Sequence, residues 1–262
     1  MILRRITTNF RRQDWTAVVV ELVIVVLGVF IGVQVSNWNQ ERADAQLGKD
    51  YVKRLTHDLE ENRDGVRAEI AYYSAVLDSV RKTDALLRST DPDPRTLVVN
   101  AYRASEILYN APVRATWDQI VSSGHLGLLP AKAVASGLSQ YFAFDTAQDL
   151  YNTGRVSDYR KAVREIIPLS MQIAMHTTCS DVRDGHGRIV GFAEHCAFEA
   201  DPVALKAVAT ALRSDPVVVA SLRYQYTFAV NATLNTGRLK GNIEEALDAL
   251  GAGLKAVKKV SP

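Results

Sequence analysis

The chain has 262 residues, of which 47% are hydrophobic and 8% aromatic, a composition that excludes wholesale disorder. Its net charge of +2 is unevenly distributed, because four of its 31 basic residues (Arg4, Arg5, Arg11 and Arg12) precede an apolar stretch at 15–35. Only two of the 29 acidic residues precede that stretch or lie in it, so 27 charges of each sign remain beyond it. This balance argues against a protein that binds nucleic acid electrostatically.

The stretch 15–35, WTAVVVELVIVVLGVFIGVQV, predicts one membrane-spanning helix. Its 21 residues are apolar except for Thr16, Glu21 and Gln34. At 1.5 Å per residue such a helix is about 31 Å long, which matches the hydrocarbon core of a bilayer. The alternative is a cleaved signal sequence, whose apolar core normally has about 7–15 residues. The only small-x-small site, at 43–45, lies well beyond the stretch, so we expect an uncleaved anchor.

The charges that flank the span predict its orientation. Arg11 and Arg12 lie directly before it, whereas the first basic residue after it is Arg42. Because basic residues stay on the cytoplasmic side, we expect residues 1–14 to form a cytoplasmic tail and residues 36–262 to form an extracytoplasmic domain.

The span also contains residues suited to contacts with another helix. Gly28 and Gly32 form a G-x-x-x-G pair, which allows two helices to approach closely. Glu21 and Gln34 offer polar contacts to a partner, although a carboxyl that snorkels or stays protonated is the alternative for Glu21. We therefore expect either self-association through the span or binding of an unidentified membrane or periplasmic protein.

Two patches of the sequence carry a resemblance to a known family. The first contains Val-Glu-Leu-Val at 20–23, Val-Leu-Gly-Val at 26–29, Gln-Val at 34–35 and Asn-Trp-Asn at 37–39. The second contains Thr-Trp-Asp at 116–118, Ser-Ser-Gly at 122–124, Leu126, Leu-Leu at 128–129 and Tyr-Phe at 141–142. Together they resemble an uncharacterised bacterial family of single-pass membrane proteins. That family's Gly-Glu pair and Gln-Val-Asn-Asn-Trp-Asn-Glu segment are altered here at Val20, Ser36 and Gln40.

The resemblance implies a membrane anchor followed by a helical domain in a bacterium. With the orientation above, this indicates an inner-membrane protein with a periplasmic domain. The resemblance implies no activity, no cofactor and no catalytic residues.

Beyond the span, apolar positions recur mostly at helical spacing, which predicts an all-α bundle. The first helix is expected from residue 39 to about residue 88 and can be continuous with the span. After the prolines of 91–94, a second helix is expected at 95–109. A short helix should then begin at Thr116, as its cap, and end at Gly124.

Proline and glycine mark the remaining helices. Pro130 should begin a helix that Gly154 can break, and a helical pattern continues from there to Pro168. Asp201-Pro202 opens a helix through Leu212, and Ser214-Asp215-Pro216 opens a last one that continues past residue 240. Gly237 and Gly241 can interrupt this last helix.

The segment 176–196, HTTCSDVRDGHGRIVGFAEHC, is rich in turn-forming residues and contains the only candidates for β-strands. Outside the cytoplasm, Cys179 and Cys196 should form a disulfide, which would contribute about 3 kcal/mol. The alternatives are two free buried thiols or a zinc site. The zinc site would draw on the residues His176, Cys179, His186, His195 and Cys196, although adjacent histidine and cysteine fit no standard ligand spacing.

The sequence carries none of the motifs G-x-S-x-G, H-E-x-x-H, the phosphate-binding glycine loop or the dinucleotide fingerprint. We therefore predict no catalytic residues and no cofactor. The function favoured is a non-enzymatic interaction, sensory or scaffolding module at the membrane. With about 14 residues expected in the cytoplasm, a signal would pass through oligomerisation or a partner. The alternative is a metal-binding protein or enzyme that uses the loop 176–196.

Overall fold

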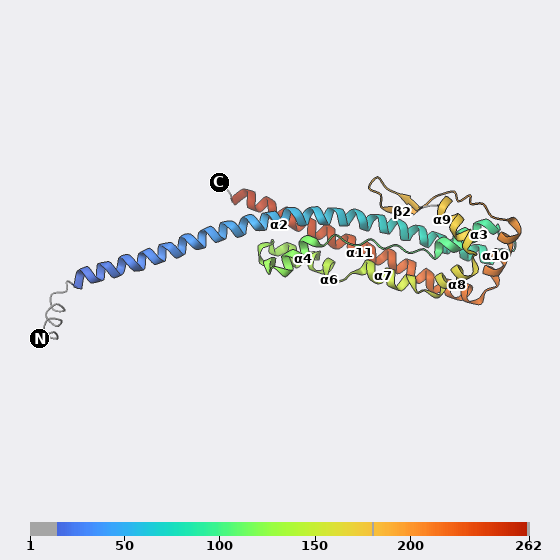
Figure 1. The fold of residues 1–262 in the computed structure, drawn as a ribbon, viewed down its shortest axis with the longest axis horizontal. Coiled ribbons are helices and arrows are strands. Elements are labelled where there is room, and N and C mark those ends of the chain that lie inside the picture. The colour runs from blue at the N-terminus through green and yellow to red at the C-terminus, as the bar shows by residue number, and fades with distance from the viewer. Residues whose placement is uncertain (1–14, 180, 261–262) are drawn as a thin grey trace. The chain divides into compact units, whose positions relative to one another are not determined.

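A computed structural model describes the backbone of residues 15–179 and 181–260 and the side chains of residues 19–179 and 181–251. These residues are mostly helical, and their only sheet has two short strands (Figure 1). The fold is all-α, as the sequence predicts. The chain divides into two compact units, Met1–Tyr51 and Val52–Pro262, and each is described by itself. The expected tail at 1–14 lies outside the described residues.

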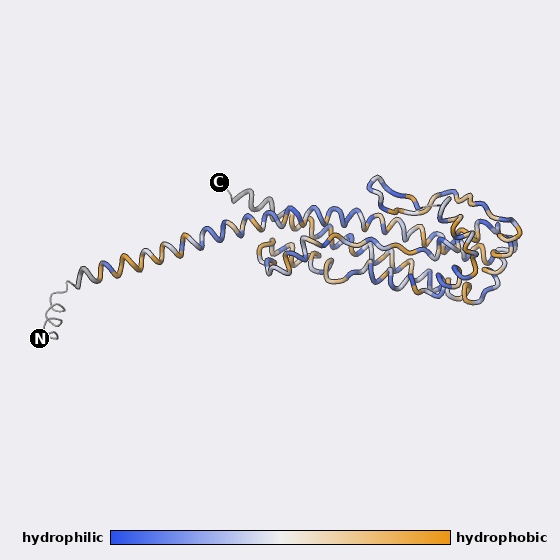
Figure 2. Tube along the Cα trace, viewed as in Figure 1, coloured by the Kyte–Doolittle hydropathy of each residue, from blue (hydrophilic) through white to orange (hydrophobic). Residues whose placement is uncertain are grey.

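Helix α2 (Trp15–Arg88) supplies every described residue of the first unit and continues into the second without a break. The side chains from Val19 to Val35 are all exposed, and the large apolar ones are 48–64% exposed. Among the described helices, this is the one that is long and apolar enough to cross a membrane. Figure 2 shows this stretch mainly in orange and the following turns of α2 mainly in blue.

The second unit is organised around two long helices, the C-terminal part of α2 and α11 (Pro216–Val260). They lie side by side and run in opposite directions (Figure 1). The rings of Tyr73 and Phe228 meet edge to face at 6.2 Å, and Arg67 approaches Glu244 at 3.9 Å. The fold of this unit therefore depends on an α2–α11 pair.

Shorter elements cover this pair. They are α3 (Pro94–Ala104), α4 (Ala115–Ser122), the 3₁₀ turn η1 (His125–Leu128), α5 (Ala131–Ala133), the π-helical turn η2 (Val134–Leu138), α6 (Ser139–Ala143), α7 (Thr146–Arg155), α8 (Asp158–Ile166), α9 (Leu169–Thr178), β1 (Asp181–Arg183), β2 (Ile189–Phe192) and α10 (Pro202–Ser214). Helices α7 and α8, together with α5 and η2, pack against α11, and α3 packs against α10.

The buried face of α2 has a strict sequence pattern. Its positions recur at alternating spacings of three and four residues, which places them on one stripe of the helix. The stripe consists of Val52, Leu55, Leu59, Asn62, Val66, Glu69, Tyr73, Val76, Val80 and Thr83, all of them buried. Three members, Asn62, Glu69 and Thr83, are polar, and each therefore needs a hydrogen-bonding partner inside the protein.

Three helices begin with the same Asp-Pro pair. Proline suits the first turn because it has no N–H to leave unpaired, and the aspartate side chain accepts a hydrogen bond from a backbone N–H of that turn. Asp93 accepts from Thr96 at 2.7 Å, Asp201 from Ala204 at 3.0 Å, and Asp215 from Val218 at 2.8 Å. The starts predicted for α10 and α11 are confirmed.

Several predicted helix boundaries are wrong. Helix α3 ends at Ala104 instead of residue 109, and residues 106–114 are irregular because side chains of other helices bind their backbone groups. Thr116 does not cap α4, which begins one residue earlier without a side-chain cap. Gly124 does end that helix in the left-handed conformation, with φ of 70°.

The helix predicted after Pro130 is broken into α5, η2 and α6, and α7 follows as a separate helix. Ser136 has an extended ψ of −179°, and the next residue, Gly137, packs directly against the backbone of Asn242 on α11. Close packing against α11 therefore accompanies the break in the helix. Conversely, α11 runs straight through Gly237 and Gly241, and α9 is a helix that the sequence pattern did not indicate.

We predict that Gly137→Ala destabilises the protein by about 1–3 kcal/mol, as is typical of overpacking. The added methyl group would lie 2.4 Å from the Asn242 carbonyl oxygen and 2.7 Å from its Cα, and this backbone cannot move without shifting α11. Denaturant unfolding of the full chain in detergent, followed by circular dichroism, measures the change.

Gly241→Ala is the matched control, because nothing lies within 4 Å of its added methyl group. In the helix interior this change should stabilise by about 0.5–1 kcal/mol. Equal effects of the two substitutions would contradict the packing described for Gly137.

Candidate functional site

The candidate contact residues of the apolar stretch do not all share one face. Glu21, Gly28 and Gly32 fall within about 40° of one another around α2, because they are seven and four residues apart at about 100° per residue. Gln34 lies on the other side, about 120–160° from each of them. All four are exposed, and nothing lies within 4 Å of a methyl group added at either glycine. One face thus combines a carboxyl group with two small residues.

The expected disulfide is present between Cys179 and Cys196, with their Cα atoms 4.8 Å apart. Cys179 ends α9, and Cys196 follows the antiparallel hairpin of β1 and β2. Gly187 forms the hairpin turn with φ of 80°. The carboxylate of Asp184 accepts hydrogen bonds from two turn N–H groups, so the turn residues have the roles that their composition indicates.

The disulfide removes both sulfurs as metal ligands, so the zinc alternative does not hold in this structure. His176 lies in the last turn of α9, His186 in the hairpin turn and His195 after β2, and all three are exposed. Among residues 19–179 and 181–251, whose side chains the structure describes, no group of three or more His, Cys, Asp or Glu side chains could hold a metal ion.

A cavity of about 440 Å³ lies beside the disulfide, between the hairpin, α2 and α3. Arg103 points from α3 to the hairpin, donates to the Ala193 carbonyl at 2.6 Å and lies over the Phe192 ring at 5.3 Å. Phe192 also meets Tyr72 of α2 edge to face at 5.2 Å. Burial raises the pKa of Asp181 at the cavity wall. These contacts hold the hairpin on the helices.

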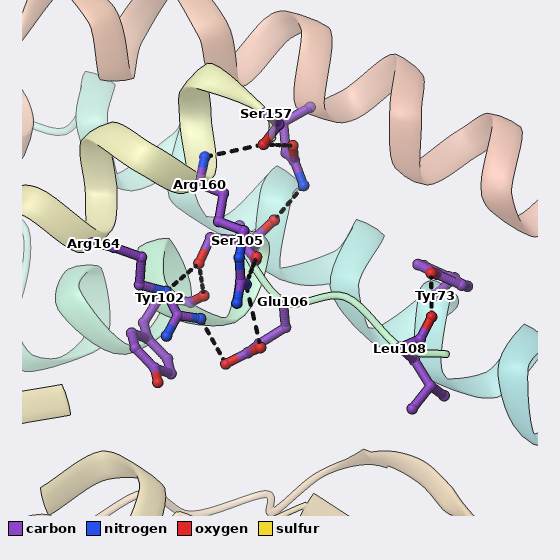
Figure 3. Close-up of polar contacts among 10 residues, drawn as sticks. Tyr73, Tyr102, Ser105, Glu106, Leu108, Ser157, Arg160 and Arg164 are labelled. Atoms are coloured by element: carbon purple, nitrogen blue, oxygen red, sulfur yellow. Dashed lines mark hydrogen bonds and ion pairs between the residues drawn. The ribbon is translucent and has the colours of Figure 1, made fainter. Parts of the chain in front are cut away.

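A polar network binds the chain where α3 ends (Figure 3). Arg164 of α8 donates to Ser105 Oγ at 3.1 Å and to Glu106 Oε1 at 2.8 Å, and its guanidinium lies 3.6 Å from the centre of the Tyr102 ring. Arg160, one turn earlier on α8, donates to the Ser105 carbonyl and lies 3.6 Å from Glu106. Arg160 therefore holds a backbone carbonyl, Arg164 holds the Ser105 side chain, and both arginines pair with the Glu106 carboxylate.

The same segment is bound from the other side by α11 and α2. Gln225 of α11 donates to the Ala104 carbonyl at 2.8 Å, and Tyr73 of α2 donates to the Leu108 carbonyl at 3.0 Å (Figure 3). Farther along, Asn62 donates to the Val113 carbonyl and accepts from its N–H, both at 2.7 Å. Side chains thus replace the hydrogen bonds that a helix would have made.

Glu69 differs from the other buried polar residues on α2. Its side chain is 3% exposed and accepts a hydrogen bond from the Asn110 N–H, but its Oε1 has no partner. Burial, with a smaller contribution from the negative charge of Asp145, raises the pKa of Glu69 to about 7. The side-chain nitrogen of Asn110 is also buried without a partner. Glu69 Oε1 and the side-chain nitrogen of Asn110 are therefore both buried and unpaired, on two residues that contact each other.

Both residues line a pocket of about 230 Å³. It lies between α2, the segment 109–113 and residues 141–147, and Arg188 of the hairpin and Leu239 of α11 complete its wall. Neither Glu69 nor Asn110 was predicted from the sequence as a site residue. One signal was available, since Glu69 is an acidic residue on the regular apolar stripe of α2, where Asn62 is the other strongly polar member.

Comparison of the chain with known protein families, with characterised proteins and with solved structures gives no match. Its function therefore has to be inferred from its own residues and their geometry.

We predict that Glu69→Gln changes the pH dependence of stability. The carboxyl pKa is higher in the folded state than its ordinary value of 4.5, so the folded state holds the proton more tightly. The stability of the unsubstituted protein should fall as pH rises from about 4.5 through 7, by up to about 3 kcal/mol. The glutamine variant lacks this loss, and its advantage should grow between pH 5 and pH 8.

Denaturant unfolding of the full chain in detergent at several pH values measures this difference. Glu61→Gln is the control, because Glu61 is an exposed residue at the same pocket and its substitution should leave the pH profile nearly unchanged. Parallel profiles for the unsubstituted chain and Glu69→Gln would contradict the raised pKa.

Proposed function

We propose that this chain is a single-pass protein of a bacterial inner membrane, with residues 1–14 in the cytoplasm and its helical unit in the periplasm. The observation that carries the proposal is the uninterrupted exposure of apolar side chains on every face of α2 from Val19 to Val35. Contiguous apolar surface of this extent is unusual on a soluble protein and suits a lipid environment.

Two further features support the sidedness. The disulfide between Cys179 and Cys196 is of the kind that persists in oxidising compartments such as the periplasm. The sequence places Arg11 and Arg12 before the span and no basic residue between them and Arg42. Both features favour the helical unit on the side opposite the N-terminus. The family resemblance supports a bacterial source.

For its role we propose a non-enzymatic interaction, sensory or scaffolding module. The support is that the half-buried arginines of α8 and the buried glutamine of α11 are engaged in holding the chain, not directed at an open site. The alternative of an enzyme or metal protein based on loop 176–196 loses its main ligands to the disulfide. We further propose that the chain self-associates through the face of Glu21, Gly28 and Gly32.

The topology predicts which sites an impermeant maleimide reaches in intact spheroplasts. Lys206→Cys, at an exposed position of α10, should react before lysis, whereas Thr7→Cys should react only after lysis. The unsubstituted chain should react only after reduction, because its cysteines are paired. The reverse pattern for the two introduced cysteines would overturn the proposed orientation. Labelling of the unsubstituted chain without reductant would show that its cysteines are not paired and would remove the disulfide as an argument for a periplasmic location.

The self-association predicts that Gly28→Ile weakens dimers, since a branched side chain would separate two helices that meet at this face. A transcription-coupled dimerisation assay in bacterial membranes should show a several-fold loss of signal. Val19→Ile is the matched control, because Val19 lies about 180° from Gly28 around the helix. Equal signals from all three chains would exclude this face as the contact.

A further inference from the structure

The pocket above Glu69 combines acidic and aromatic side chains. Its acidic residues are Glu61 and Glu69 of α2 and Asp145 at the start of α7. Its aromatic residues are Tyr109, Tyr141 and Phe144. This combination is typical of sites for organic cations, because carboxylates and ring faces both attract positive charge.

The burial of these residues gives the pocket a floor and a rim. Glu69 is 3% exposed and Tyr141 is 6% exposed, whereas Phe144 is 74% exposed. A large apolar ring with that exposure, next to a polar pocket, offers a surface for a ligand that enters from solvent. The volume of about 230 Å³ corresponds to roughly eight water molecules, so the ligand would be small.

The unpaired atoms define what the ligand must supply. Glu69 Oε1 needs a donor and the Asn110 side-chain nitrogen needs an acceptor, because buried polar atoms are almost always paired. Neighbouring basic residues do not meet this need. Arg188 lines the pocket but is paired with Asp184 at 3.5 Å, and Arg114 is paired with Asp118 at 3.0 Å. Among the described residues, no cation pairs with Glu69.

A metal ion fits these residues less well than an organic cation. The acidic residues of the pocket do not converge into a group that could ligate a metal within the described part of the chain. Aromatic walls provide no metal ligands but contact alkyl and ammonium groups well. The unpaired amide nitrogen also requires an oxygen acceptor, which a bare cation lacks.

We infer that this pocket binds a small primary ammonium compound that also carries a neutral oxygen, such as an amino alcohol. The ammonium group donates to Glu69 Oε1, and the oxygen accepts from the Asn110 side chain. Tyr141 and Phe144 contact its carbon atoms. This ligand is additional to the proposed membrane role and does not depend on it, since every residue concerned lies in the second unit.

Binding should depend on pH. The titratable groups that line the pocket with Glu69 are Glu61, Tyr109, Tyr141, Asp145 and Arg188, and Tyr73, one turn along α2, also interacts with the Glu69 charge. Because the pKa of Glu69 is raised to about 7, part of the population holds a proton there at neutral pH. An ammonium ligand favours the ionised carboxylate, so binding releases a proton and strengthens as pH rises from 5.5 to 7.5.

Isothermal titration calorimetry of the full chain in detergent tests the inference with four probes. Ethanolamine should bind saturably at millimolar concentration or tighter. Propylamine, which lacks the oxygen, should bind at least several-fold more weakly, and propanol, which lacks the charge, should not bind. Glycine, whose carboxylate would face Glu61 and Asp145, should also bind weakly. At pH 6.5, titrations in buffers of different ionisation enthalpy should show proton release.

Two variants assign the binding to this pocket. Glu69→Gln should weaken ethanolamine binding at least tenfold, and Glu60→Gln should not, because Glu60 is an exposed neighbour outside the pocket. Phe144→Ala should also weaken binding, and because Phe144 is largely exposed its substitution should leave the fold intact. Absence of saturable ethanolamine binding to the unsubstituted chain would overturn the inference. So would affinity that is unchanged in both pocket variants, or equal binding of propanol.

Discussion

The fold of the helical unit depends on one irregular segment, residues 106–114, which runs between α2, α8 and α11. A helix satisfies its own backbone groups, but an extended segment among helices leaves them to find other partners. Here they are supplied by side chains: Arg160 and Gln225 bind carbonyls at the end of α3, and Tyr73 and Asn62 bind Leu108 and Val113. Asn62 and Gln225, two of the buried polar residues of the unit, are located where the chain at this segment needs them, whereas Ser79, Thr83 and Thr236 bond within their own helices.

This constraint also explains the unusual state of Glu69. The residue occupies a position of the α2 stripe that faces the segment, and the Asn110 N–H pairs with its carboxylate. Asn62 satisfies both polar atoms of its amide against Val113, whereas the Glu69 carboxylate keeps one oxygen unpaired. The pairing with the Asn110 N–H thus explains why a carboxylate is buried at this segment, but it does not explain why Glu69 Oε1 is left without a partner. The ligand proposed for the pocket would supply that missing partner.

The sequence predicted those features that local chemistry determines. The apolar stretch, the helical spacing of α2, the Asp-Pro starts of α10 and α11, and the glycine at the end of α4 all follow from residues adjacent in the chain. The end of α3 at Ala104 could not be predicted in this way, because residues up to 109 retain a helical pattern. Donors far away in the sequence, on Arg160, Arg164 and Gln225, bind Ala104 and Ser105 where that helix ends. The break at Ser136 likewise accompanies a contact with Asn242.

The candidate site was less predictable than the fold for the same reason. Glu69, Asn110 and Asp145 are far apart in the sequence, and each alone resembles an ordinary surface or turn residue. Only the regular stripe of α2 marks Glu69 as buried, and a buried carboxyl can equally have a structural partner. Its unpaired oxygen depends on the path of residues 109–113, which no local pattern determines.

The disulfide solves a different problem, the weak attachment of the β1–β2 hairpin. A two-stranded hairpin is marginally stable by itself, and in this one only Gly191 is buried. It is held by the ring contact of Phe192 with Tyr72 and by the hydrogen bond from Arg103 to Ala193. The disulfide joins Cys179 and Cys196, on either side of the hairpin, and closing a loop of this length contributes about 3 kcal/mol in the chain-entropy estimate. A covalent bond therefore supplies the stability that a small apolar contact surface cannot.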